Sequence, residues 1–135
     1  MSIARTATAL CLLLMACSST NEDPSTCDVP AGDCYRSGME RQGSQSIVRL
    51  LEASPGPPER GDFNVWTLEV TDLDGNPMEN ISVRVDPTMP SHGHGTTPLP
   101  TVTALEGTDT QYEARPLNLF MPGLWQIRVY NCLIN

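Results

Sequence analysis

Apolar and polar residues alternate in short runs along most of the chain. In the segment FNVWTLEVTD, residues 63–72, Trp66, Leu68 and Val70 occupy every second position. The segment NISVRVD, residues 80–86, alternates in the same way. Because successive side chains of a strand point to opposite faces, each run predicts a β-strand with one buried face.

Weaker runs of the same kind predict further strands at 46–53, 99–105, 111–120 and 124–130. The run 111–120 changes phase at Pro116, so we expect a bulge or an edge position there. Segments rich in proline, glycine and aspartate separate the runs, as in SPGPPERGD (54–62) and DGNP (74–77). These segments predict turns and loops.

Short alternating strands with no run of helical period predict an all-β fold, a single immunoglobulin-like β-sandwich. We expect the sandwich to occupy residues 46–135. The polar, turn-rich residues 17–45 are expected to form a tether and an N-terminal arm pinned by a disulfide. Six inward-facing residues are expected to share one core: Trp66, Val83, Val85, Trp125, Ile127 and Val129.

The first sixteen residues have the features of an export signal. Met1–Thr8 carries one positive charge and no acid, and the apolar run ALCLLLMA that follows is too short to span a bilayer. The run ends in LMAC, which resembles the lipobox of bacterial lipoproteins. That resemblance implies that Cys17 is the lipidated first residue of the mature protein. The residue after the cysteine is Ser18 and not an aspartate. This favours the outer membrane of the bacterial cell envelope as the destination.

The remaining cysteines predict a disulfide. On this expectation Cys11 would be removed with the signal and Cys17 would be acylated, which leaves Cys27, Cys34 and Cys132. An exported protein meets an oxidising compartment, so a disulfide is expected. Cys27 and Cys34 are nearest in sequence and form the favoured pair. A bridge from one of them to Cys132 is the alternative, and one cysteine stays unpaired in either case.

The charge balance restricts the partners. Sixteen acidic residues stand against eight basic ones, all of them arginine, for a net charge of −8. Such a chain lacks the basic surface that nucleic acid or anionic lipid would require. We therefore expect contact with the membrane only through the lipid anchor, and no binding of nucleic acid.

Both histidines of the chain lie in the segment MPSHGHG, at positions 92 and 94. In an extended segment, side chains two residues apart project to the same side, so His92 and His94 can offer imidazoles to one ion. Met89 and Met121 can add thioether sulfur, and imidazole with thioether fits copper better than calcium or magnesium. Asp86 can complete a zinc site instead. The alternative is purely structural: the glycines form a sharp turn and the methionines fill the core.

Several motifs together resemble the YtkA-like domain family. These are the D-x-x-G-x-P turn, the MPxHGHG segment, the Y-x-A strand and the MPGLWQIRV ending, over about residues 62–131. That family in turn resembles FixH and CopC-type β-sandwich proteins of the bacterial envelope. The resemblance implies an immunoglobulin-like envelope domain, with copper handling suggested by those neighbours.

These observations favour a non-enzymatic lipoprotein that binds a copper ion through His92 and His94. No Ser/His/Asp set has motif support, since both histidines share one loop and no G-x-S-x-G occurs. The main alternative is an immunoglobulin-like interaction module that holds a protein partner without metal. A zinc hydrolase-like site is a weaker third hypothesis.

Overall fold

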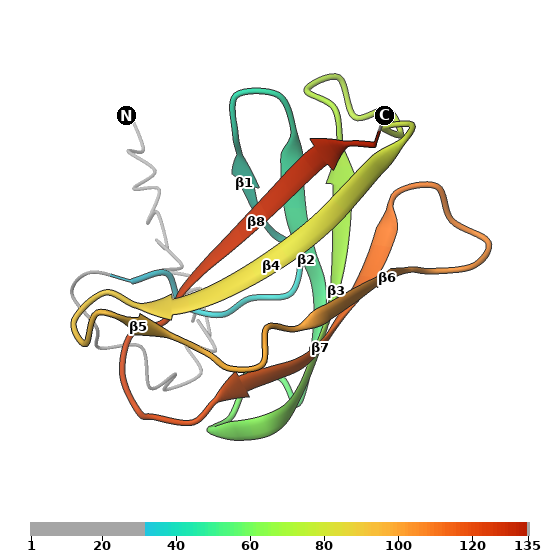
Figure 1. The fold of residues 1–135 in the computed structure, drawn as a ribbon. Coiled ribbons are helices and arrows are strands. Elements are labelled where there is room, and N and C mark those ends of the chain that lie inside the picture. The colour runs from blue at the N-terminus through green and yellow to red at the C-terminus, as the bar shows by residue number, and fades with distance from the viewer. Residues whose placement is uncertain (1–31, 135) are drawn as a thin grey trace, which may run out of the picture.

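The structure is a computed structural model that describes residues 32–134. Its residues form strands and turns without any helix, in two antiparallel sheets (Figure 1). The strands are β1 (Met39–Gln42), β2 (Ile47–Ser54), β3 (Gly61–Thr71), β4 (Ile81–Met89), β5 (His94–Gly95), β6 (Thr101–Ala104), β7 (Gln111–Leu119) and β8 (Gln126–Leu133). The predicted all-β sandwich is confirmed. The signal peptide 1–16, Cys17 and Cys27 lie outside the described residues, so the predictions made for them stay predictions.

The two sheets differ in size. The larger has the strand order β1-β2-β3-β7-β6, and the smaller has the order β5-β4-β8. In Figure 1 the β4–β8 pair crosses in front of β1, β2 and β3. Within residues 32–134 no helix is both long enough and apolar enough to cross a membrane.

The predicted strands agree with the observed ones to within a few residues. β1 was not expected: it lies in the polar stretch assigned to the arm and pairs with β2 over Met39–Gln42. The bulge expected at Pro116 is confirmed. Asn64 pairs with Leu117 and Trp66 pairs with Ala114. Two residues of β7, Arg115 and Pro116, therefore lie opposite the single residue Val65 of β3.

The core lies between the sheets and is centred on five buried residues, Leu50, Leu68, Val85, Ala114 and Leu117. Trp66, Ile127 and Val129 pack against this cluster as expected, although each is only partly buried. Val83 and Trp125 do not belong to it. Val83 pairs with the polar Asn131 near one end of the small sheet. Trp125 precedes β8, where the alternation of the strand does not yet apply.

Candidate functional site

The segment that carries both histidines forms a tight turn after β4. The carbonyl oxygen of Met89 accepts hydrogen bonds from the backbone N–H groups of His92 at 3.1 Å and Gly93 at 2.9 Å. Gly93 has φ of +69°, in the left-handed region that favours glycine. The chain then returns as β5, in which His94 pairs with Met89. The glycine-rich turn of the structural alternative is therefore present, and it carries both imidazoles.

An aromatic cluster fixes the ring of His94. It stacks on Phe120 with ring centroids 5.4 Å apart and 20° between the planes, and meets Trp125 edge-on at 6.2 Å. Phe120 and Trp125 also contact each other, at 5.6 Å. The indole Nε1 of Trp125 donates a hydrogen bond to the carbonyl oxygen of Met121 at 3.0 Å. The MPGLW segment therefore packs against the histidine turn, which brings two distant parts of the sequence together.

The two imidazoles lie close to each other. The ring centroids of His92 and His94 are 5.7 Å apart, with 57° between the planes. His92 is exposed and His94 is half-buried, so both are within reach of solvent. Nδ1 of His94 lies 3.2 Å from the carbonyl oxygen of Gly95. That oxygen can only accept, so the contact requires a proton on Nδ1 and leaves the lone pair of a neutral ring on Nε2.

The two methionines have different surroundings. Met89 is only 1% exposed. Its Cε would lie 2.9 Å from a Cβ at Gly123, which shows that Met89 packs directly beneath the MPGLW turn. Met121 is half-buried in that turn. His92, His94 and Met121 thus lie on two segments that meet at one end of the sandwich, whereas Met89 fills the interior below them.

Phe120 and Trp125 were not identified as site residues from the sequence. Phe120 follows β7 and is 42% exposed. Its large apolar ring lies outside the core and packs instead on His94 and Trp125. The expectation that Trp125 belongs to the core is wrong, because its indole covers His94. Both aromatics flank the Met-Pro-Gly turn, and this adjacency was the available signal.

Metal-ligand residues of the usual types do not gather elsewhere in the part of the chain that is described. Residues 32–134 contain no group of three or more His, Cys, Asp or Glu side chains suited to hold an ion. Cys132 is a free, exposed thiol, so the alternative disulfide to Cys132 is not formed. The pairing of Cys27 with Cys34 stays a prediction.

Comparison with known families identifies the domain. The sequence profile described as YtkA-like matches residues 48–130, from β2 into β8 and through both loops of the candidate site. The chain belongs to the YtkA-like family. The resemblance noted in the sequence is thereby confirmed, and membership supports a non-catalytic, envelope-type domain. No curated protein and no solved structure matches the chain. Because the family match spans residues 48–130, both loops of the candidate site belong to the YtkA-like domain.

Proposed function

We propose that this YtkA-like protein is a non-enzymatic lipoprotein of the bacterial envelope that binds copper through His92 and His94. The 5.7 Å separation of the two ring centroids carries the proposal. An ion bound by one nitrogen of each ring at about 2 Å sets the centroids roughly 4.5–6 Å apart. The separation of the two rings is therefore compatible with one shared ion.

The surroundings of His94 support a role as a ligand. A histidine that binds a metal through one nitrogen commonly donates the other N–H to a backbone carbonyl, which fixes the ring and its tautomer. The contact of His94 Nδ1 with Gly95 O has this form. Phe120 and Trp125 hold the ring on its other sides. In this proposal His94 is the preoriented ligand, and the exposed imidazole of His92 binds the same ion as the second ligand.

The chemistry of the available donors favours copper. Two imidazoles with a thioether from Met121 form a soft-to-borderline set, which suits copper and does not suit calcium or magnesium. Met89 is buried in the core, so in this proposal it supports the turn and does not reach the ion. The lipobox-like LMAC before Ser18 supports export of the protein and anchoring at a membrane surface, an environment in which copper is met.

The experiment is a copper titration of the mature chain, with Cys17 and Cys132 both replaced by serine so that neither of these thiols competes for the ion. The parent is expected to bind one copper ion. His92→Ala with His94→Ala is expected to lower the affinity at least about 100-fold, because both nitrogen ligands are lost. Ser91→Ala, an exposed neighbour in the same turn, is the matched control and should bind like the parent.

Circular dichroism and thermal melting show whether the double variant remains folded. A folded double variant with an unaltered copper titration would remove the histidine pair from consideration. The affinity of the parent is also expected to fall as the buffer is acidified, because protons compete with copper for imidazole nitrogen.

A further inference from the structure

One long strand edge in the described residues has no partner. The order β2-β3-β7-β6 against β5-β4-β8 reproduces the order of strands A, B, E and D against C′, C and F in an immunoglobulin sandwich. In that fold, strand G pairs with the outer edge of F. The corresponding edge of β8 is unpaired within residues 32–134.

The other edges are short, whereas β8 is not. β1 and β6 have four residues each and β5 has two. β8 has eight residues and pairs with β4 without any irregularity from Gln126 to Leu133. Proteins usually protect exposed sheet edges with short strands, bulges or proline, because the unpaired backbone N–H and C=O groups of an edge can hydrogen-bond to a further strand. β8 has none of these features.

A cavity of about 1030 Å³ lies beside this edge, between β8 and the β1–β2 side of the large sheet. Its apolar wall comes from both sheets and includes Val48, Leu50, Trp66, Leu68, Ile127 and Val129. Ile127 and Val129 point toward the core yet stay half-buried, and no strand of the described part of the chain covers them on this side.

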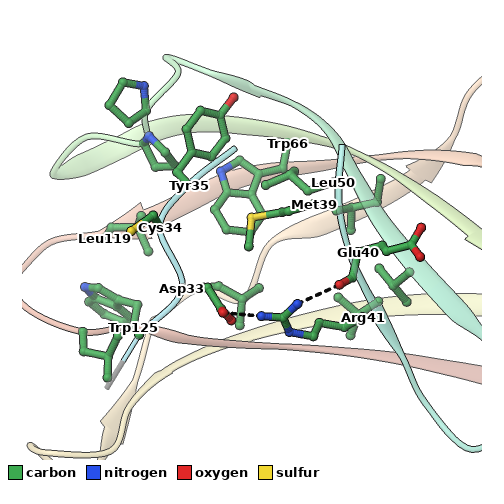
Figure 2. Close-up of a pocket in the computed structure, with 18 of the residues that line it drawn as sticks. Asp33, Cys34, Tyr35, Met39, Glu40, Arg41, Leu50, Trp66, Leu119 and Trp125 are labelled. Carbon is green, nitrogen blue, oxygen red and sulfur yellow. Dashed lines mark hydrogen bonds and ion pairs between the residues drawn. The ribbon is translucent and has the colours of Figure 1, made fainter. Parts of the chain in front are cut away.

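The cavity also contains an unsatisfied donor. Nε1 of Trp66 is buried and has no hydrogen-bond partner among residues 32–134. Figure 2 shows its indole between Tyr35 and Met39, with the ion pair of Asp33 and Arg41 nearby. A buried donor without an acceptor is costly and needs an explanation. An occupant that supplies an acceptor removes the cost.

We propose that the cleft beside β8 accepts an extended segment of a partner protein. The segment adds a strand to the free edge of β8, and its apolar side chains enter the cavity at alternate positions. One of its inward-facing groups accepts the hydrogen bond from Trp66 Nε1. Gly123 and Trp125 of the MPGLW segment also line the cavity, so the cleft adjoins the histidine site, but pairing of a strand with β8 does not require copper.

Charges on the outer face define the partner further. Arg84 and Arg128 lie on the outer face of the β4–β8 pair, and neither takes part in an ion pair among the described residues. Arg84 lies over the ring of Tyr130, 4.7 Å from its centroid, and the guanidinium of Arg128 donates a hydrogen bond to Gln126 Oε1. Acidic side chains at the outward positions of the added strand complement these arginines. The partner segment therefore alternates apolar and acidic residues.

The same charges argue against a second copy of this chain. A symmetric pairing of two β8 edges brings Arg128 of each copy toward the other, and like charges on neighbouring strands destabilise a sheet. The residues that follow Cys17, SSTNEDPSTCDVPA, offer only one large aliphatic side chain, Val29, to fill the cavity. The occupant is accordingly a segment of another protein.

The test uses synthetic ten-residue peptides and the mature chain with Cys17→Ser and Cys132→Ser. One peptide alternates valine and glutamate, with one central inward-facing valine replaced by threonine to supply an acceptor for Trp66 Nε1. A second peptide has the same composition in blocks, and a third carries lysine in place of glutamate. The alternating acidic peptide is expected to bind at least about ten-fold more tightly than either of the others. Binding is expected to protect backbone amides of β8 from hydrogen exchange and to shift the indole N–H resonance of Trp66.

Arg128→Glu is expected to reverse the preference, so that the lysine peptide binds more tightly than the glutamate peptide. Arg60→Glu, an exposed arginine in the loop before β3, is the matched control and should leave the preference unchanged. The proposal would be overturned if the block peptide bound as tightly as the alternating one, or if the protein dimerised through β8. It would also be overturned if the amides of β8 were protected by residues 18–31 of the same chain without any peptide. Filling of the cavity by a fatty acid while the β8 amides stay unprotected would contradict it as well.

Discussion

Gly123 lies directly against the buried side chain of Met89, so that an ideal Cβ at position 123 would come within 2.9 Å of Met89 Cε. Met89 ends β4 and Gly123 belongs to the turn before β8. Their contact joins the two loops of the candidate site. The geometry of the histidine turn therefore depends on the absence of a side chain at a residue about thirty positions away in sequence.

Gly123→Ala is expected to lower the free energy of unfolding by about 1–3 kcal/mol. The new methyl group meets Met89, and φ of +130° at this position is unfavourable for any L-residue with a side chain. Urea unfolding measures the loss. Gly107→Ala is the control, since φ is +79° there but nothing lies within 4 Å of the new Cβ. An equal loss in both variants would show that the contact with Met89 has no cost.

Asn64→Asp is expected to destabilise the domain by about 2–4 kcal/mol. Asn64 is fully buried, and its Nδ2 donates to the carbonyl oxygens of Glu59, Gly61 and Leu117 at 2.7, 3.2 and 3.1 Å. A carboxylate places an acceptor against these three acceptors. The exposed Asn80→Asp should change stability by less than about 0.5 kcal/mol. Chemical denaturation at neutral pH compares them, and similar losses would contradict the assigned hydrogen bonds.

Asp72 is expected to make the stability of the turn before β4 depend on pH. Its pKa is lowered, first by a hydrogen bond from the backbone N–H of Asn76 and then by one from the Asn76 side chain. The stabilisation is therefore present above the unfolded aspartate pKa of about 3.9 and lost as pH falls through the lower folded pKa. The difference in urea midpoint between the parent and Asp72→Ala should shrink in acid. A difference that stays constant down to pH of about 2 would refute the linkage.

The two methionines are expected to respond differently to substitution by leucine. Met121→Leu should weaken Cu(I) binding about ten-fold and leave the fold stable, because it removes a thioether from the site. Met89→Leu keeps the buried volume, so it should change stability by less than about 1.5 kcal/mol and leave copper affinity unaltered. Parallel Cu(I) titrations measure both. The opposite pattern would make Met89 the sulfur ligand.

The strand pattern could be predicted from the sequence because alternation reports directly on which face is buried. Trp66, Leu68 and Val70 follow this rule, and their strand was found. β1 was missed because it is short and polar after Met39, and only pairing with β2 makes it a strand. Trp125 was misplaced because it lies in a turn, where alternation carries no information.

The candidate site was only partly visible in the sequence. The spacing of His92 and His94 indicated that the two rings can approach each other, and the structure places them 5.7 Å apart. The aromatic contacts of His94 and the burial of Met89 depend on how the two loops meet across the sandwich. Such long-range packing leaves no local pattern in the sequence. The open edge of β8 likewise follows from the order of the strands and not from the residues of β8.

The central proposal, that His92 and His94 together bind copper, is tested most directly by X-ray absorption spectroscopy of the copper-loaded protein with Cys17→Ser and Cys132→Ser. The spectrum is expected to show scattering from two imidazole rings on each copper ion, and His92→Ala with His94→Ala is expected to abolish it. A parent spectrum without imidazole scattering, or one that the double substitution leaves unchanged, would contradict the proposal.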